Sequence, residues 1–516
     1  MTNLRKVLAI KSFRVTHQIH ERYASFLVMS FSFRPSQILI ESHLQRTIGS
    51  MNTCSANIDF DTVVVGGGSA GYAAARSLAA GGQKVAVVDG ARELGGLCIL
   101  RGCMPTKALL WAAEVRHLAH KSSIWGFKGV NLDFELSDVM KRKDEMIQEF
   151  AAYRQNQLQE GRFKLFRATA SFRNSRSLQL SDGTVIGAKD IVLTTGSMVA
   201  PVPVHDLNTI GFLTSDSALR LARLPESIIV LGGGAIAIEF AQFFARFGVK
   251  TTILQRSETL LKEVDVDAAQ AIKASFEDEG IEVITSTKLL GAHCSGNSKV
   301  IRFEKHGESH ELSASEVFHG LGRVPAIKEL NLGIAGVETR GGAIATNEHM
   351  QTSMRHIWAA GDCTGRHEVV HAAIHQGETI AHNILNPTGL RSVDDRLLMN
   401  VVFSDPQVAT LGLTEKAAKA AGIPIISASY SFNDHGKSMI MGVRHGFVKV
   451  IAHPQTGEIL GACCVGPQAG DLIHEMTVAM AKRMTVREFA AVPHYHPTLA
   501  EIWTYPSEEL VERLPS

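Results

Sequence analysis

Two cysteines five positions apart, Cys98 and Cys103, are the residues of this 516-residue chain best suited by type and spacing to redox chemistry. A regular α-helix rises about 1.5 Å per residue, so it would hold them about 7.5 Å apart along its axis. The Cα atoms of a disulfide lie only about 4.4–6.8 Å apart. The pair can therefore close a disulfide only in a bent segment, and Gly102 and Pro105 permit such a bend. Strain of this kind makes a disulfide easier to reduce, as a catalytic one must be.

The residues after Pro105 favour a helix, because Ala108, Ala112 and Val115 recur at intervals of three and four. Cys103 would then lie at a helix N-terminus, where the helix dipole lowers the pKa of a thiol and favours the thiolate. The cysteines alone leave two other interpretations open, a pair of buried thiols and a zinc site. Zinc is the weaker of the two, because no second Cys/His pair lies at ligand spacing.

A glycine motif precedes the cysteines. An apolar strand over residues 61–65 is followed by Gly66, Gly68 and Gly71, an alanine-rich helix, and a second strand that ends at Asp89. This order is typical of a dinucleotide-binding β-α-β unit, in which the glycines allow a tight turn and close approach of the backbone. The helix N-terminus faces the pyrophosphate, and the acid accepts a hydrogen bond from a ribose hydroxyl.

A second motif of the same kind contains Gly232, Gly234 and Ala237, and its following strand ends in Gln255 and Arg256. No acid stands at that strand end. An arginine suits a ribose 2′-phosphate, whereas a carboxylate suits the 2′-hydroxyl of NAD. The second motif therefore predicts a preference for NADPH. Two alternatives stay open, namely that Arg256 is a solvated surface charge and that Gln255 accepts either nucleotide.

Together, the cysteine segment and the two motifs resemble those of the class I pyridine nucleotide-disulfide oxidoreductases, such as dihydrolipoyl dehydrogenase, glutathione reductase and mercuric reductase. The resemblance covers about residues 57–510. It implies an α/β fold with two Rossmann-like dinucleotide-binding domains and an α+β C-terminal dimerisation domain. The implied limits are an N-terminal extension at 1–56, an FAD-binding domain at 57–201 and 326–396, an NAD(P)-binding domain at 202–325 and a dimerisation domain at 397–516.

Three further stretches resemble parts of the same family: a strand leaving the FAD domain at 191–197, a returning strand at 318–325, and a second FAD motif at 359–363. The resemblance implies that FAD is bound by Gly66, Gly68, Ser69, Ala70, Gly71, Asp89, Gly96, Lys107, Thr195, Gly196, Gly361 and Asp362. It implies that NAD(P)H is bound by Gly232, Gly234, Ala237, Gln255, Arg256, Gly322 and Arg323. No metal ligand set is expected.

The resemblance also implies catalytic roles for six residues: Cys98, Cys103, His496, Glu501, Lys107 and Glu239. Cys103 would be the flavin-proximal thiol and Cys98 the thiol that exchanges with substrate. His496 and Glu501, in a His-Pro-Thr-x-x-Glu stretch, would move protons at the active site of the partner subunit, so a homodimer is implied. Lys107 would pair with Glu239 beside the flavin, and the alternative is a purely structural ion pair.

The implied function is an FAD-dependent NAD(P)H:disulfide oxidoreductase, dihydrolipoyl dehydrogenase-like, that passes electrons between nicotinamide, FAD, a redox-active Cys98–Cys103 disulfide and a dithiol/disulfide substrate. One alternative is a mercuric reductase-like reductase of metals or quinones. The other is a redox sensor or structural flavoprotein subunit. Two residues depart from the family pattern: Leu97 stands where a threonine is usual, and Ala235 where some members place a tyrosine over the flavin.

Composition limits the partners. The 52 basic and 51 acidic residues nearly balance, so nothing points to nucleic acid or an anionic membrane. No apolar run reaches the ~18 residues of a transmembrane helix. Residues 1–50 are basic and poor in acids, as in a mitochondrial presequence. The favoured alternative is that translation begins at Met51, which stands just ahead of the first expected strand. The expected compartment is the cytoplasm, or the mitochondrial matrix if the presequence is real.

Overall fold

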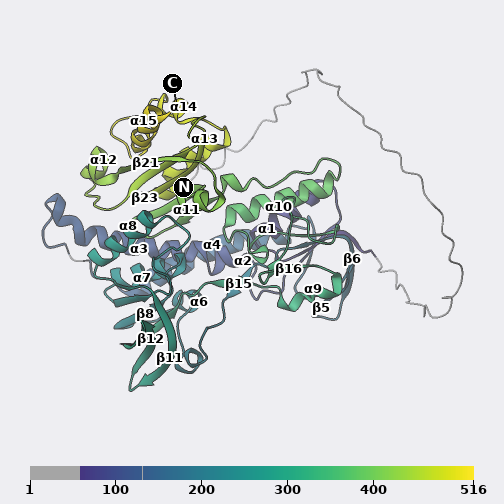
Figure 1. The fold of residues 1–516 in the computed structure, drawn as a ribbon. Coiled ribbons are helices and arrows are strands. Elements are labelled where there is room, and N and C mark those ends of the chain that lie inside the picture. The colour runs from purple at the N-terminus through teal and green to yellow at the C-terminus, as the bar shows by residue number, and fades with distance from the viewer. Residues whose placement is uncertain (1–57, 131, 516) are drawn as a thin grey trace, which may run out of the picture. The chain divides into compact units, whose positions relative to one another are not determined.

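The computed structural model describes residues 58–130 and 132–515 (Figure 1). The N-terminal extension expected over residues 1–56 lies outside this part of the chain. None of the described helices is long and apolar enough to cross a membrane.

The first glycine motif belongs to a seven-stranded sheet. Its central strands are nearly continuous apolar runs, as strands covered on both faces must be, and Val63 and Val64 are completely buried. The chain leaves this sheet after β6 and returns as β18, which pairs with β6 in parallel. The strands are β1 (Phe60–Val65), β2 (Val85–Val88), β3 (Lys164–Phe166), β4 (Ala170–Asn174), β5 (Ser177–Leu180), β6 (Val185–Leu193) and β18 (Ile357–Ala359).

Helices from distant parts of the sequence cover one face of this sheet. The first, α1 (Ser69–Ala80), packs side by side with α10 (Val370–Leu385), as Figure 1 shows. Both contribute to one apolar core with the valines of β1 and β2. The segment between β2 and β3 forms α2 (Gly96–Leu100), α3 (Cys103–Lys121) and α4 (Leu136–Gln159).

The helix expected after the cysteines exists, but the residues whose spacing indicated it are not the ones that it buries. Pro105, Leu109 and Ala113 are buried, whereas Val115 is 45% exposed. The spacing of three and four occurs on more than one face of this apolar helix, so periodicity identified the helix but not the side that packs.

The second glycine motif lies in a four-stranded parallel sheet in the order β10-β9-β8-β14. Beside it are a three-stranded antiparallel sheet and the short pair formed by β7 and β15. The strands are β7 (Ser197–Val199), β8 (Ser227–Leu231), β9 (Lys250–Leu254), β10 (Glu282–Ile284), β11 (Thr287–Ser295), β12 (Ser298–Lys305), β13 (Glu308–Ala314), β14 (Glu316–His319) and β15 (Arg323–Pro325). The helices are α5 (Asp206–Ile210), α6 (Ser215–Ala218), α7 (Ala235–Arg246) and α8 (Val266–Asp278).

The stretch expected as one returning strand over 318–325 is divided between two sheets. Phe318 and His319 end β14, which pairs with β8, whereas Arg323 begins β15, which pairs with β7. Gly322 lies between the two strands with a φ of 104°, a left-handed conformation that favours glycine. After β15 the chain forms α9 (Leu332–Ala335), β16 (Thr339–Arg340) and β17 (Ala343–Ile344) before β18.

The C-terminal part is a five-stranded antiparallel sheet in the order β19-β20-β23-β22-β21. Residues 403–406 separate β19 from β20, which pair as antiparallel neighbours. The strands are β19 (Met399–Val402), β20 (Gln407–Gly412), β21 (Ile426–Ser431), β22 (Phe447–Ala452) and β23 (Ile459–Gly466). The helices are α11 (Glu415–Ala421), α12 (Gly436–Ile440), α13 (Ala469–Ala481), α14 (Val486–Ala490) and α15 (Thr504–Arg513).

The two faces of this C-terminal sheet enter different cores, because successive side chains of a strand point to opposite faces. Cys463 and Val465 pack in the core that contains the phenylalanines of α7. Ala462 and Cys464 pack in a core with α13 and α15. The adjacent cysteines of β23 therefore point away from each other as packing residues.

Candidate functional site

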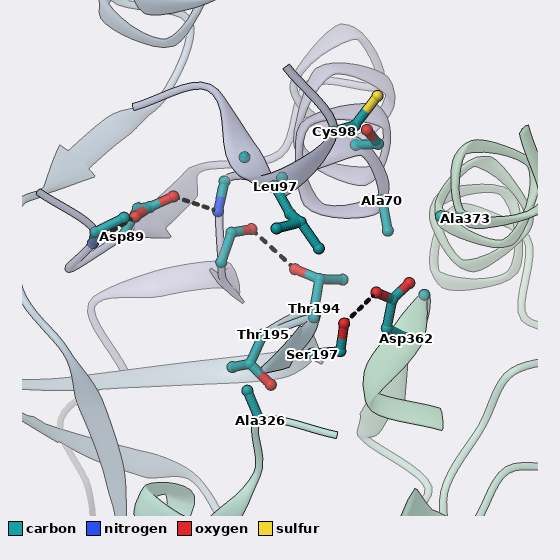
Figure 2. A pocket seen from close by; sticks show the side chains of 18 of the residues that line it. Ala70, Asp89, Leu97, Cys98, Thr194, Thr195, Ser197, Ala326, Asp362 and Ala373 are labelled. Carbon is teal, nitrogen blue, oxygen red and sulfur yellow. Dashed lines mark hydrogen bonds between the residues drawn. The ribbon is translucent and has the colours of Figure 1, made fainter. Parts of the chain in front are cut away.

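A cavity of about 510 Å³ opens at the carboxyl ends of β1, β2 and β6, where open α/β sheets bind ligands (Figure 2). Its lining contains the first glycine motif, the cysteine segment and the second FAD motif. Of the residues expected to bind FAD, those that line it are Gly66, Gly68, Ser69, Ala70, Asp89, Gly96, Thr195, Gly196, Gly361 and Asp362. Gly71 and Lys107 are not among its lining residues.

The glycine loop has the geometry of a dinucleotide cradle. Gly66 has a φ of 105°, and a Cβ on Gly71 would come within 1.8 Å of the Gly66 carbonyl oxygen, so both positions require glycine. Asp89 holds the loop from the neighbouring strand end: its Oδ2 accepts from the Gly67 N–H at 2.9 Å and its Oδ1 from the Ala91 N–H at 2.9 Å. Gly71 thus does not line the cavity, but it packs against the backbone of Gly66, which does.

The far wall of the cavity comes from the ends of β6 and β18. Thr194 donates its hydroxyl to the carbonyls of the glycine loop, and Ser197 donates to Asp362 Oδ2 at 2.6 Å, as Figure 2 shows. The hydroxyl of Thr195 is buried and has no hydrogen-bond partner among the described residues. An unpartnered hydroxyl, an acid and a glycine cradle suit the phosphates and hydroxyls of FAD, so the residues present fit that cofactor.

Arg323 lies with the residues of this cavity wall, although it was expected to bind NAD(P). Its Nε donates to the Ser197 hydroxyl at 2.9 Å and its Nη2 to the Ser197 carbonyl at 2.9 Å. Through Ser197 it therefore steadies Asp362. Sequence reasoning missed Ser197, whose partners lie 126 and 165 positions away in the chain.

The two cysteines lie at a break between helices. The first, Cys98, is within α2, which ends at Leu100, and Cys103 is the first residue of α3. Gly102 joins them with φ −125° and ψ −114°, so the segment is bent as expected. Both thiols are free and line the cavity.

These thiols are electrostatically unequal. A hydrogen bond from the Cys98 thiol, helped by the positive charge of Lys107, lowers the pKa of Cys103 to about 7. The same hydrogen bond, together with burial, raises the pKa of Cys98 well above the usual thiol range. Cys98 therefore keeps its proton, and Cys103 is the cysteine that ionises to the thiolate near pH 7.

Lys107 is one turn along α3 from Cys103 and forms the expected ion pair with Glu239 of α7. Its Nζ lies 3.0 Å from Oε1 and 2.8 Å from Oε2 of the carboxylate. Glu239 is almost fully buried and also accepts from the Phe403 N–H at 2.9 Å. The pair therefore joins three distant segments of the chain and holds the Lys107 ammonium near Cys103.

The second glycine motif has Ala237 in place of a third glycine and Gln255 in place of an acid, and the structure accommodates both. Ala237 fits because residue 320 is glycine: a Cβ there would lie 2.8 Å from the Ala237 methyl. The buried Gln255 occupies the acid's position, but its amide is committed to its own loop. It accepts from the Arg256 N–H at 3.0 Å and donates to the Thr259 carbonyl at 3.1 Å.

His496 and Glu501 are hydrogen-bonded to each other. The ring Nδ1 of His496 lies 2.9 Å from Oε2 and 3.1 Å from Oε1 of the carboxylate. Glu501 is buried, while 75% of the His496 side chain is exposed. Neither residue lines the cavity of the cysteines. Sequence reasoning missed a third member, the buried His435, whose Nε2 lies 3.2 Å from Glu501 Oε1.

Within residues 58–130 and 132–515, one cluster could supply three metal ligands: His117, Glu279 and Asp405. Arg246 already occupies its carboxylates, with ion pairs of 2.7 Å to Glu279 and 2.5 Å to Asp405. Burial and this guanidinium lower the pKa of His117 to about 4. The cluster is therefore neutralised by a cation of the protein itself.

Comparison of this chain with known proteins identifies its family. The pyridine nucleotide-disulphide oxidoreductase model matches residues 60–377, and the dimerisation domain model of the same family matches residues 398–506. A dihydrolipoyl dehydrogenase of Bacillus subtilis is 33% identical over 461 residues, which cover 86% of this chain and 96% of that protein. A mercuric reductase of Staphylococcus aureus is 32% identical over 86% of this chain and 81% of its own length.

Among solved structures, the Cu(II) complex of the HOCl-induced flavoprotein disulfide reductase RclA from Escherichia coli superposes with a TM-score of 0.78. It is 26% identical, and the match covers 88% of this chain and 99% of that one. The two family models together span both dinucleotide-binding motifs, the cysteine segment and the C-terminal sheet of this chain. The chain belongs to the pyridine nucleotide-disulphide oxidoreductases, FAD-dependent enzymes that use NAD(P)H, and it carries their dimerisation domain.

Proposed function

We propose that this enzyme catalyses dithiol–disulfide exchange on a small or protein-bound substrate, with Cys98 as the exchanging thiol and with His496 of a second subunit as its acid–base partner. The observation that carries the proposal is the unequal pair of thiols at the cavity. Cys98 retains its proton, so it needs a base before it can attack a disulfide. Dihydrolipoyl dehydrogenase-like exchange is a reaction that such a pair can perform, and several relatives are dihydrolipoyl dehydrogenases.

FAD bound in the cavity would supply two-electron transfer between the nicotinamide and the cysteines. Cys103, as the thiolate beside Lys107, is the cysteine suited to face it. The ion pair of Lys107 with Glu239 would hold a positive charge against that thiolate throughout the cycle. Ser197 and Arg323 would keep Asp362 oriented toward the cofactor's hydroxyl groups.

The exchange step follows from the two thiols. In the direction of disulfide reduction, Cys98 gives its proton to His496 and its sulfur attacks one substrate sulfur, which breaks the substrate disulfide and leaves a mixed disulfide. His496 then protonates the departing substrate thiolate. The Cys103 thiolate next attacks the Cys98 sulfur, which releases the second substrate sulfur as a thiolate and closes the Cys98–Cys103 disulfide. This second thiolate takes its proton from the solvent. Two electrons have passed to the substrate, and both of its sulfurs leave as thiols.

His496 and Glu501 are absent from the lining of their own subunit's cavity, and the exposed ring of His496 is free to reach another molecule. The dimerisation domain supplies that molecule as a second copy of the chain. We also propose that the FAD-binding domain comprises residues 57–201 and 326–396, the NAD(P)-binding domain residues 202–325 and the dimerisation domain residues 397–516. The compartment is reducing, such as the cytoplasm, because Cys98 and Cys103 must cycle as thiols.

The nucleotide proposed is NADPH. The position of the usual acid at the end of β9 holds Gln255, whose amide is committed to its own loop and offers no carboxylate to a ribose 2′-hydroxyl. Arg256 is exposed at that strand end and could pair with a 2′-phosphate.

A second candidate is reduction of a metal ion, because one relative is a mercuric reductase and one solved structure is a Cu(II) complex. In that reaction the cysteines would serve the metal without proton transfer by His496. Loss of turnover in His496→Ala separates the two candidates, because only dithiol–disulfide exchange requires the histidine.

Purified heterodimers carrying two different tags test the proposal, with lipoamide and dihydrolipoamide as probes. If the site is shared, Cys98→Ser paired with His496→Ala retains one intact site and about half of wild-type activity. The matched control pairs wild type with a chain carrying both substitutions, and it should be inactive. The opposite pattern would place the whole site within one subunit and would refute the proposal.

A further inference from the structure

Glu501 has a second histidine partner that no part of the proposed mechanism uses. His435 lies in the loop before α12 and is completely buried, with 0% of its side chain exposed. We propose that His435 is a positioning residue that fixes the Glu501 carboxylate, and through it the His496 ring, for proton transfer during exchange. This inference rests on the proposed function of His496.

The hydrogen bonds form a chain of four residues. Ser438 Oγ lies 2.8 Å from His435 Nδ1, and His435 Nε2 lies 3.2 Å from Glu501 Oε1. The same carboxylate accepts from His496 Nδ1 at 2.9 and 3.1 Å. Since a carboxylate only accepts, the ring N–H of His435 must be on Nε2. Its Nδ1 is then an acceptor, which the Ser438 hydroxyl satisfies as donor.

Burial lowers the pKa of His435, although the charge of Glu501 opposes this shift. His435 is therefore neutral at physiological pH and has a single N–H to give. One end of that ring is fixed by Ser438, so the N–H points steadily at Glu501. A neutral donor satisfies the carboxylate without neutralising its charge, which His496 needs when it takes up a proton.

The surroundings hold His435 in place. Tyr505 of α15 stacks on Tyr430 of β21 with ring centroids 4.1 Å apart, and its ring lies edge-on to His435 at 6.2 Å. Phe432 packs edge-on at 6.4 Å. The titratable groups that face or adjoin His435 are Glu501, His496, Tyr430, Tyr505 and Asp434.

The hydrogen bond from His435 fixes the orientation of the Glu501 carboxylate, which the exposed His496 ring alone would leave loosely held. His496 is largely exposed and is the only other side chain that donates to the Glu501 carboxylate among the described residues. A buried carboxylate held only by a mobile ring would turn with it, and leaving it with one donor is costly. Because His435 is immobile, Glu501 keeps its orientation, and His496 is directed by a fixed acceptor.

His435→Met and His435→Gln are a matched pair for the test. Methionine fills the buried space without a donor, whereas the glutamine amide can reach Glu501 from nearly the same position. The holoenzyme is assayed with dihydrolipoamide in stopped flow, and reduction of the enzyme by NADPH is followed separately. We expect His435→Met to slow the dihydrolipoamide half-reaction about tenfold, the effect of one lost hydrogen bond to a charged group.

Two readouts distinguish positioning from general damage to the fold. The pH profile of the dihydrolipoamide half-reaction should move to higher pH in His435→Met, because the Glu501 charge then acts on His496 alone, and it should return in His435→Gln. Reduction by NADPH should stay within twofold of wild type. Ser438→Ala, which leaves the histidine volume intact, should show a smaller change in the same direction.

An unchanged or acid-shifted profile in His435→Met, or equal slowing of both half-reactions, would overturn the inference while leaving the proposed function intact. In a His496→Ala background, His435→Met should have no further effect on the rate; a further loss would also contradict it. If the wild type shows no exchange that depends on His496, the proposed function itself fails and the inference falls with it.

Discussion

Replacement of Cys98 by alanine should abolish the acidity of Cys103. The hydrogen bond from the Cys98 thiol is the largest influence that lowers the pKa of Cys103 from its ordinary value of 9.0 to about 7. That difference of two units corresponds to about 2.7 kcal/mol in favour of the thiolate. Without the donor, only Lys107 and a backbone hydrogen bond oppose burial, so the pKa should rise above about 8. The thiolate fraction at pH 7 then falls from about half to less than about one tenth.

The assay is the pH dependence of iodoacetamide labelling of the reduced enzyme, resolved by mass spectrometry of the peptide that contains Cys103. Cys294 is a free, exposed thiol and serves as the internal control, because its labelling should not respond to Cys98→Ala. Lys107→Met is the comparison variant and should raise the midpoint less, since its charge is a smaller influence than the hydrogen bond. A midpoint for Cys103 that stays within half a unit of 7 in Cys98→Ala would refute the reasoning.

Two further predictions concern the nucleotide and the stability of the fold. Arg256→Ala should raise the KM for NADPH about tenfold while leaving that for NADH within twofold, measured by initial rates; equal effects on both would contradict a 2′-phosphate contact. Arg246→Met should lower the free energy of unfolding by about 3–5 kcal/mol in urea titrations, because it strands the buried carboxylate of Glu279 and leaves Glu114 and Asp405 unpaired. Arg246→Lys should lose clearly less, and an equal loss would argue that packing rather than charge holds this junction.

Local sequence signals determined the secondary structure around the glycine motifs. The valine-rich strand of residues 61–65 and the strand at 250–254 appear as β1 and β9, since parallel strands covered on both faces have an unbroken apolar pattern. Gly102 likewise marked the bend between Cys98 and Cys103, because glycine tolerates backbone conformations that side chains oppose. Such signals involve residues close together in the chain.

Local signals did not determine which face of α3 is buried. They also did not determine how residues 318–325 are divided between two strands. Several faces of α3 are apolar, so burial depends on which neighbours reach them, and here α4 and α7 cover Leu109 and Ala113. A run of apolar residues shows that strands form but not which sheet each half joins. That choice is made by pairing energy with distant strands, β8 for one half of 318–325 and β7 for the other.

Some features of the candidate site were likewise predictable from local sequence, and others were not. The sequence by itself predicted which residues carry chemistry, because the CxxxxC spacing, the glycine motifs and the His-Pro-Thr-x-x-Glu stretch are contiguous patterns. Only the tertiary structure decided that Arg323 holds Ser197 and Asp362, and that His435 shares the Glu501 carboxylate across 66 positions. The physical reason is that a buried polar group must find hydrogen-bond partners wherever the fold places them, and no periodicity in the chain records where that is.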